Sequence, residues 1–461
     1  MNKLPTSRAS RRAFLQRAGQ LSLTGVAAPW ALNLAAMAEA SAQTASDYKA
    51  LVCVFLYGAN DHGNTLPPYD AATHANYVSI RGSLATARAN LAATALTPTV
   101  ALPVGRQMAL APELAPLKTL FDAGRMGVLL NVGTLIQPTT LAQYNARSVP
   151  LPPKLFSHND QQSVWQSSLP EGATSGWGGR LGDLFQSGNG KSTFTCVNVS
   201  GNAVFMSGRD AVQYQVSTTG SVALRGIQSP LYGSQACSDA LRAITTASRS
   251  HLMAAEHTRV MARAIDANTS LSAALATTPA LTTPFDAANP LATQLQMVAR
   301  MIAARSALGA KRQVFFVSLG GFDLHDFLVA QHPGLLTNVG GAIKSFHDAT
   351  VELGVANQVT TFTGSDFGRT LTSNGDGSDH GWGSHQFLVG GAVQGGRFHG
   401  QLPAFSVNGP DDVGQGRLLP TTSVDQLAAT LATWMGVSNT NLPLVVPNIG
   451  NYSVRDLGLL G

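Results

Sequence analysis

The sequence predicts an α/β fold in which helices cover both faces of a predominantly parallel β-sheet. Three observations lead to this prediction. Residues 50–56 (ALVCVFL) form a continuous apolar run of the kind found in strands that are covered on both faces. Similar short runs recur along the chain, with segments of helical spacing between them. Charged residues make up only 12% of the 461 residues and 46 residues are glycine, which suits a large domain rich in loops.

The strands, taken in chain order, start from that first run, which ends in the polar segment 57–64 (YGANDHGN). Further short apolar runs predict strands at 126–132, 194–199, 313–319, 359–363 and 387–393. Strands that alternate with helices form βαβ units, and such units make neighbouring strands parallel. The chain order therefore favours a mostly parallel sheet.

Helices are predicted where apolar residues recur with a helical period. One covers residues 115–123, and the Ala/Thr-rich stretch 238–310 has helical spacing that is broken by three prolines. A last helix begins after the N-cap residue Ser423, ends at Gly436 and is expected to be structural. Residues 200–235 are rich in Gly, Ser and Gln, so we expect loops or a small peripheral insertion there.

Residues 1–42 are identified as a twin-arginine signal segment. Paired arginines lie within residues 10–16 (SRRAFLQ), a moderately apolar stretch covers about 21–37, and small residues suited to cleavage follow. Because that stretch is short and contains a glycine and a proline, a membrane anchor is disfavoured. We expect the twin-arginine translocation machinery as a partner, a periplasmic or secreted location, and one α/β domain over residues 47–461.

The positive charge of the chain belongs mainly to the signal segment. The chain carries +5 with a pI of about 9.2, and residues 1–42 hold five of the 30 basic residues and one of the 25 acidic ones. The remainder carries +1 and has no extended run of Lys or Arg that would contact phosphates. Nucleic-acid binding and a stable membrane anchor of the mature form are not expected.

Carboxylate and imidazole groups gather next to the ends of the predicted strands. They are Asp61, Asp323, His325, Asp366, Asp379, His380 and His385. In a parallel sheet the loops beyond the carboxyl ends of the strands meet at one edge, where ligands bind. Asp oxygens and His nitrogens suit a divalent metal ion, and zinc, manganese and calcium are the candidates. The three cysteines are too scattered to supply a thiolate site.

Each of these residues also has a structural alternative. Asp61 can cap a turn, Asp366 can pair with Arg369, and His385 can be a hydrogen-bonded core histidine. Ser157 can be the N-cap of a helix, in a motif that resembles a capping box with Asp160 in place of Glu. Alternatively, a hydroxyl at a helix N-terminus that faces a metal can act as a nucleophile.

These motifs resemble those of a known family. The strand leading into Asp61, the helix start at 156–158 (FSH), the segment 321–325 (GFDLH), residues 365–370 (SDFGRT) and residues 379–381 (DHG) are similar to the twin-arginine-exported bacterial proteins grouped as domain of unknown function 1501. That family is in turn similar to the alkaline phosphatase and sulfatase superfamily. The resemblance covers nearly the whole chain and implies an alkaline-phosphatase-like fold.

The superfamily resemblance implies a hydrolase of phosphate or sulfate esters with one or two divalent metals. By motif position, Asp61 and Asp366 would hold one ion, Asp323, His325 and His380 or His385 the other, and Ser157 would be the nucleophile. The chain departs from the superfamily pattern in two places. Asp323 and His325 are two residues apart rather than four, and Phe367 follows Asp366 where the phosphatases have histidine. No Cys-x-Pro-x-Arg sulfatase signature is present.

Two functions follow from these residues. The first is an exported metal-dependent hydrolase of an anionic ester, in which metal ions polarise the ester oxygen and activate serine or water. The second is a non-catalytic extracytoplasmic binding or scaffold protein that keeps the hydrolase fold, because a fold does not guarantee an activity.

Overall fold

A ten-stranded sheet crosses the part of the chain that the computed structural model describes, residues 47–461. The strand order is β10-β2-β8-β7-β1-β6-β3-β4-β5, and β9 pairs with β2. The strands are β1 (Lys49–Leu56), β2 (Met126–Gly133), β3 (Cys196–Asn198), β4 (Tyr214–Ser217), β5 (Gly220–Ser221), β6 (Arg312–Leu319), β7 (Val359–Ser365), β8 (Ser384–Gly390), β9 (Arg397–His399) and β10 (Thr422–Ser423).

The sheet is mostly parallel, as predicted. β1 pairs in parallel with β6 on one side and with β7 on the other, and β3 continues the parallel order beyond β6. β8 is antiparallel to both β7 and β2. The reason lies in the connection from β7 to β8, which contains no helix, so the chain turns back without the crossover that a parallel neighbour needs.

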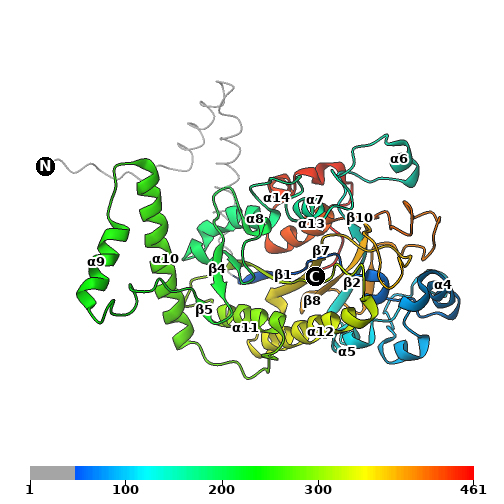
Figure 1. The fold of residues 1–461 in the computed structure, drawn as a ribbon, viewed down its shortest axis with the longest axis horizontal. Coiled ribbons are helices and arrows are strands. Elements are labelled where there is room, and N and C mark those ends of the chain that lie inside the picture. The colour runs from blue at the N-terminus through cyan, green and yellow to red at the C-terminus, as the bar shows by residue number, and fades with distance from the viewer. Residues whose placement is uncertain (1–46) are drawn as a thin grey trace. The chain divides into compact units, whose positions relative to one another are not determined.

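Helices cover both faces of the sheet (Figure 1), so the predicted fold class is confirmed. α7, α8, α13 and α14 lie on one face, and α5, α11 and α12 lie on the other. The helices discussed below are α3 (His62–Thr65), α4 (Ala71–Arg81), α5 (Ala115–Asp122), α7 (His158–Ser167), α8 (Trp177–Phe185), α9 (Gln235–Thr246), α10 (Leu252–Thr277), α11 (Pro290–Ala303), α12 (Leu328–Glu352), α13 (Val424–Met435) and α14 (Leu442–Val445).

The two faces of β1 bury different side chains, because successive residues of a strand point to opposite sides. Val52 and Val54 join the aliphatic core formed with α5, α11 and α12. Phe55 points to the other face and packs edge-on against Trp165 of α7, with 5.1 Å between ring centroids. Burial on both faces explains why the β1 sequence is apolar throughout rather than alternating.

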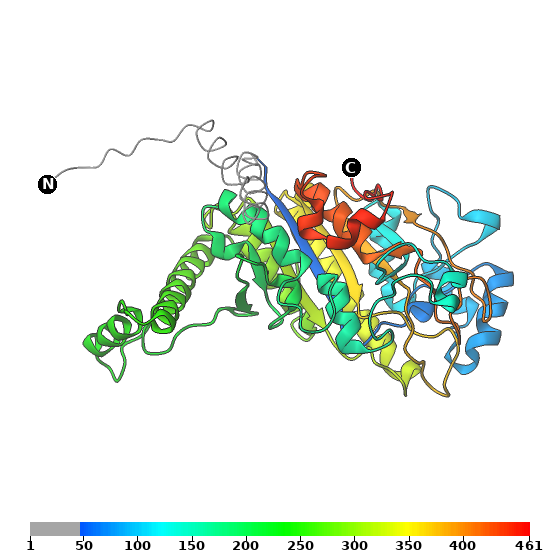
Figure 2. The same ribbon diagram turned by 90° about the horizontal axis from the view of Figure 1, so that it is seen from above.

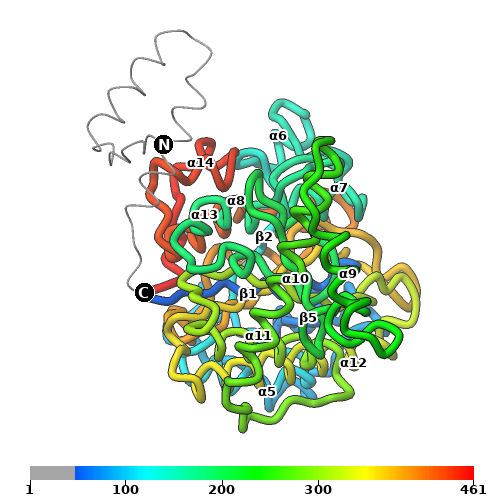
Figure 3. Tube along the Cα trace, turned by 90° about the vertical axis from the view of Figure 1, so that its left-hand side faces the viewer, coloured from blue at the N-terminus to red at the C-terminus, as the bar shows by residue number. Residues whose placement is uncertain are grey.

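Helices α9 and α10 project away from the sheet, as Figures 1 and 2 show, and in the view of Figure 3 they face the viewer. They come from the Ala/Thr-rich stretch, which forms α9, α10 and α11, and α11 starts at Pro290 because proline is tolerated in the first turn of a helix. The segment 200–235 is not only loops, since it adds β4 and β5 at the edge of the sheet.

The other elements lie close to their predicted positions. The predicted last helix is α13, and Ser423 and Gln426 form a capping box at its start while Gly436 ends it in a left-handed conformation. The last predicted strand begins three residues earlier than expected, at Ser384. The predicted signal segment, residues 1–42, lies outside the described residues. Within residues 47–461 no helix is both long and apolar enough to cross a membrane.

The topology gathers three loops at one edge of the sheet. β7, β1 and β6 are parallel neighbours, so the loops that follow Leu56, Leu319 and Ser365 leave the same edge. β8 runs in the opposite direction, so the loop that leaves β7 after Ser365 both starts and ends at that edge, where it enters β8 at Ser384. These loops carry every aspartate and histidine that the sequence singles out except His385, which is the second residue of β8.

Candidate metal centre

Three imidazole rings and one carboxylate converge at this edge of the sheet. The Nε2 atoms of His158, His325 and His380 lie 3.3, 3.1 and 3.4 Å from Oδ1 of Asp323. The Nε2 atom of His380 also lies 3.1 Å from that of His158 and 2.8 Å from that of His325. A single ion would be within reach of His158, Asp323 and His380, whose ligand atoms all lie within 4.8 Å of one another, whereas His325 contacts only Asp323 and His380 of this group.

These separations match tetrahedral metal coordination. Zinc is bound by His nitrogen and Asp oxygen at about 2.0–2.1 Å, so the ligand atoms of a tetrahedral site are about 3.3–3.4 Å apart. The distances among His158, Asp323 and His380 are 3.1 to 3.4 Å and lie close to that value, so these three groups fit three corners of such a site. We call His158, Asp323, His325 and His380 the metal cluster.

The Nδ1 atom of each imidazole in the metal cluster is held by a hydrogen-bond acceptor. Asp366 Oδ2 lies 2.6 Å from His158 Nδ1, and Asp379 Oδ1 lies 3.3 Å from His325 Nδ1. The backbone oxygen of Phe156 lies 2.7 Å from His380 Nδ1. These groups accept a hydrogen bond from Nδ1–H. The lone pair of each neutral ring is therefore on Nε2, which faces the cluster. Metal-binding histidines in proteins are oriented in this way.

The local chain conformation places these groups. His158 is the first residue of α7, and Gln162 lies one turn later on the same side of the helix, where its amide donates to Asp366 Oδ2 at 2.7 Å. Phe156 adopts the left-handed conformation with φ of 71°, which is uncommon for a residue other than glycine. We infer that the strained turn before α7 is retained because it directs the Phe156 carbonyl at His380.

Charges around the metal cluster favour a negatively charged Asp323. Burial opposes ionisation and is the largest single effect, but the hydrogen bond from Arg369 and the nearby charges of Arg369 and the histidines together lower the pKa of Asp323. The Nη1 atom of Arg369 lies 2.6 Å from Asp323 Oδ1. Burial lowers the pKa of His380, and it also opposes protonation of His158, but the carboxylates of Asp366 and Asp323 together overcome it and raise the pKa of His158. Lone pairs and a carboxylate that face one another repel unless a cation lies between them.

The donor set distinguishes between the ions expected from the sequence. The nitrogens of His158 and His380 and the carboxylate oxygen of Asp323 suit zinc, which accepts mixed nitrogen and oxygen ligands, and three protein ligands leave one position of a tetrahedral site free. Calcium takes six to eight oxygen ligands, and manganese also favours oxygen. The metal cluster offers one carboxylate, so its chemistry fits zinc better than either alternative.

One side of the metal cluster is accessible. The side chains of Asp323, His325 and Asp379 are 46, 40 and 41% exposed, whereas those of His158 and His380 are 23 and 25% exposed. A ligand approaching from outside would therefore meet the Asp323 and His325 side first. Catalytic zinc sites keep such an open position for water or substrate, whereas structural sites are closed.

The aspartates expected as ligands occupy three different positions. Asp323 belongs to the metal cluster. Asp366 and Asp379 do not, because they contact the Nδ1 atoms of His158 and His325 instead. Asp61 lies apart from the cluster, where it caps α3 and forms a buried ion pair with Arg81 at 2.5 Å. Burial opposes ionisation of Asp61, yet Arg81 holds its pKa well below the usual range. The turn-capping alternative therefore describes Asp61, and Arg369 pairs with Asp323 rather than with Asp366.

His385 also lies apart from the metal cluster. It is buried in β8, where its Nδ1 accepts a hydrogen bond from the backbone amide of Asn131 at 3.1 Å. Its ring packs edge-on against His62, with 5.3 Å between centroids. Burial lowers the pKa of His385 well below its ordinary value, so the ring is neutral. The core-histidine alternative describes this residue because β8 has already begun at Ser384 and holds it inside the sheet.

Ser157 lies directly before His158 in the metal cluster. Its backbone occupies the N-cap position of α7, but its hydroxyl does not cap the helix. Instead, Oγ donates a hydrogen bond to Oδ2 of Asp160 at 2.9 Å. Asp160 is buried, and the exposed Lys154 approaches its other oxygen at 3.5 Å. The predicted capping hydrogen bond is therefore absent, and a carboxylate is in place to accept the serine proton.

His158 is absent from the set of ligands predicted from the sequence. The segment that contains it draws attention to Ser157, the neighbouring hydroxyl, rather than to the imidazole. A usable signal is the pair His158 and Gln162, because polar residues four apart share one face of a helix. Arg417 is also missed, although its Nε donates to the His380 backbone oxygen at 2.8 Å and its guanidinium stacks 5.0 Å from the Phe156 ring centroid.

Comparison with known proteins gives a family match. The family model described as "Protein of unknown function (DUF1501)" matches residues 48–445, a range that contains the whole metal cluster. A search of curated proteins found no match.

Similar solved structures include the PsFucS1 sulfatase from Pseudoalteromonas sp. at 9% identity, with 93% of this chain and 76% of that chain covered and a TM-score of 0.37. The C-terminal periplasmic domain of EcEptC from Escherichia coli is 10% identical, with 90% and 88% covered and a TM-score of 0.36. A mutant of the alkaline phosphatase PafA is 12% identical, with 70% and 64% covered and a TM-score of 0.28.

Proposed function

The chain belongs to the DUF1501 family of proteins of unknown function, and from that premise we propose that it is a zinc-dependent hydrolase of phosphate or sulfate esters. The observation that carries the proposal is the metal cluster, in which three Nε2 atoms and a carboxylate oxygen face one another while each Nδ1 is held by an acceptor. Zinc bound there would polarise an ester oxygen and lower the pKa of a bound water.

An anionic substrate is supported by the cation at the border of the metal cluster. Arg417 contacts the backbone of His380 and the ring of Phe156, and no described carboxylate lies within ion-pair distance of its guanidinium. Its charge is therefore free to attract an ester oxygen anion. Arg369 is different, because its side chain is fully buried and its Nη1 already bonds Asp323, so we propose that it positions that ligand.

Ser157 is the proposed nucleophile. Its hydroxyl already donates to the Asp160 carboxylate, which is the arrangement needed to remove the proton as oxygen attacks. The N-terminus of α7 adds a partial positive charge that favours the developing negative charge. A water molecule activated next to the metal cluster is the alternative nucleophile, and the variant Ser157→Ala separates the two because only a serine nucleophile is lost with the hydroxyl.

The proposed place of action is outside the cytoplasm. The paired arginines, apolar stretch and small residues of the segment 1–42 support export through the twin-arginine pathway. This pathway carries folded proteins, so zinc would be bound before export. A fusion of residues 1–42 to a reporter enzyme should reach the periplasm, and replacing Arg11 and Arg12 by lysine should retain it in the cytoplasm.

A non-catalytic binding or scaffold role is the second candidate. The observation in its favour is that two arginines already neutralise two candidate ligands, Arg81 at Asp61 and Arg369 at Asp323. Screening phosphate monoesters, phosphate diesters and sulfate esters with added zinc separates the two functions. The hydrolase should turn over at least one class and lose that turnover in His158→Ala, whereas a scaffold should turn over none.

A further inference from the structure

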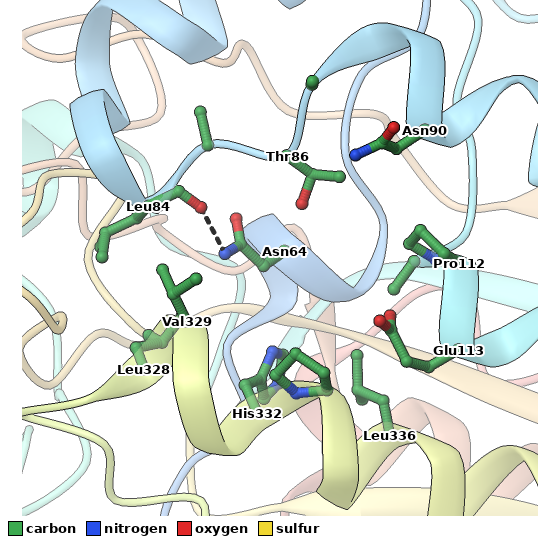
Figure 4. Close-up of a pocket in the computed structure, with 14 residues that line it drawn as sticks. Asn64, Leu84, Thr86, Asn90, Pro112, Glu113, Leu328, Val329, His332 and Leu336 are labelled. Carbon is green, nitrogen blue, oxygen red and sulfur yellow. Dashed lines mark hydrogen bonds between the residues drawn. The ribbon is translucent and has the colours of Figure 1, made fainter.

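A cavity is lined in part by Asn64 of α3, and none of its lining residues belongs to the metal cluster. It has a volume of about 350 Å³ and lies between the first turns of α12, the segment 84–90 and the short 3-10 helix Pro112–Leu114 (Figure 4). That volume is in the range of small-molecule sites in proteins.

Polar groups without protein partners point into this cavity. Figure 4 shows the side chains of Thr86, Asn90 and Glu113 directed at the open space between the surrounding elements. Among residues 47–461, no hydrogen bond or ion pair engages the Thr86 hydroxyl, the Asn90 amide or the Glu113 carboxylate. Ligand pockets combine an apolar wall with a few converging polar groups of this kind.

His332 adds a further acceptor. It is buried, and burial lowers its pKa to about 4, so the ring is neutral at pH 7. Its Nε2 lies 2.8 Å from Asn60 Oδ1, an acceptor, so the proton is on Nε2 and Nδ1 carries a lone pair. Pro333 lacks an amide hydrogen, so the Val329 carbonyl one turn earlier loses its usual helical donor.

The rest of the cavity wall combines apolar side chains with polar groups that bond one another. Asn64 donates to the backbone oxygen of Leu84 at 2.8 Å and accepts from the Tyr77 hydroxyl at 2.7 Å. The Tyr77 hydroxyl in turn accepts from the backbone amide of Thr86 at 2.8 Å. Leu328 and Leu336 of α12 complete the apolar surface. The side chain of Asn64 is therefore satisfied within the wall, and Glu113 is the one Asp, Glu, Lys or Arg among the lining residues.

We propose that this cavity binds a small organic molecule with one ammonium group on an apolar body. The acceptors Glu113 and His332 would receive the ammonium hydrogens, and the leucines would cover the apolar part. The excess of acceptors and the single negative charge argue against an anionic ligand. The site is independent of the proposed hydrolase function, because no residue of the metal cluster lines it.

The test measures binding of cyclohexylammonium chloride and of neutral cyclohexanol to the folded protein by isothermal titration calorimetry. Cyclohexylammonium should bind saturably, and cyclohexanol about tenfold or more weakly, because a hydrogen bond to a charged group is lost. Glu113→Gln keeps the shape of the side chain and should weaken cyclohexylammonium binding by a similar factor. The matched control Glu256→Gln, on exposed α10, should leave binding unchanged.

A gain-of-function variant keeps the proposal testable if Glu113→Gln does not fold. Asn90→Asp places a second carboxylate in the cavity and should tighten cyclohexylammonium binding several-fold. Absence of saturable binding to the wild-type protein would overturn the proposal. Equal binding of the amine and the alcohol, or wild-type affinity in a folded Glu113→Gln protein, would overturn it as well.

Discussion

Replacing Asp366 by asparagine tests whether the groups behind the metal cluster set its affinity for zinc. Asp366 is buried, and its Oδ2 lies 2.6 Å from His158 Nδ1 and 2.7 Å from Gln162 Nε2. The amide of Gly58 also approaches both carboxylate oxygens, at 3.4 and 3.3 Å. All three neighbours are donors, whereas asparagine has one acceptor oxygen. Its NH₂ group must therefore face another donor.

The expected loss follows from this change. His158 keeps at most a neutral acceptor at Nδ1, so its Nε2 becomes less basic and its ring is less firmly oriented. Loss of a partner behind a metal ligand weakens metal binding by about 10- to 100-fold, which corresponds to about 1.4–2.7 kcal/mol. We expect the upper part of this range, because the Asp366–His158 contact is short and shielded from water.

The assay is competition for zinc against a chromophoric chelator, with the apparent dissociation constant as the readout. Asp379→Asn is the matched control, because Asp379 lies 3.3 Å from His325 Nδ1 and its side chain is 41% exposed. The control should lose less affinity than Asp366→Asn, and both variants should have the thermal midpoint of the wild-type apoprotein within a few degrees. Wild-type zinc affinity in a folded Asp366→Asn protein would refute the reasoning.

Three further predictions concern substrate binding, pH and packing. Arg417→Ala should raise KM for an anionic ester about tenfold and leave zinc affinity within twofold, because one charged contact to the substrate is lost while no zinc ligand is removed. Steady-state kinetics measure the KM, and the chelator assay measures the zinc affinity. Burial raises the pKa of Asp425 to about 6, so in the folded state this group holds more protons than in the unfolded state between about pH 4 and 6, and its contribution to the free energy of unfolding should fall by up to about 3 kcal/mol as pH rises through that window. Urea titrations across this range should show the free energy of unfolding of the wild-type protein falling by this amount relative to that of Asp425→Asn, and parallel profiles would contradict the assignment. Gly368→Ala would place a methyl group 2.0 Å from the Gly383 oxygen and should destabilise the fold by about 3 kcal/mol, measured as a lower urea midpoint; an unchanged midpoint would contradict this packing.

Much of the fold is readable from the sequence because its signals are local. The run at 50–56 is apolar at every position since β1 is buried on both faces, and Ser423 and Gly436 mark the ends of α13 by capping chemistry. The antiparallel direction of β8 is not readable in this way. It depends on the chain crossing from β7 without a helix, and the strand itself has an ordinary apolar sequence.

The candidate site is readable only as a neighbourhood. The sequence predicts that loops at strand ends meet, and the structure places Asp323, His325 and His380 together there. The sequence cannot distinguish a residue that binds the metal directly from a carboxylate that holds a metal-binding histidine, because Asp323 and Asp366 follow strands in the same way. His158 escapes prediction because it comes from α7, and its approach to Asp323 depends on the packing of that helix against the sheet rather than on a strand end.

The arginines explain the remaining difference between prediction and structure. A carboxylate at a strand end is equally suited to a metal ion and to a guanidinium, and the choice depends on which partner the fold delivers. Arg81 reaches Asp61 from the end of α4, twenty residues further along the chain. That pairing has no local sequence signal. From the sequence alone, Asp61 therefore resembles a metal ligand, although it caps α3 and pairs with Arg81.

The most direct test of the account is the zinc content of the purified protein. Elemental analysis after loading with zinc chloride and gel filtration should give one zinc per chain for the wild-type protein. The variant His158→Ala should retain little zinc, while His257→Ala, at an exposed histidine of α10, should retain the wild-type amount. A folded wild-type protein without stoichiometric zinc, or a His158→Ala protein that keeps it, would contradict the proposed metal centre.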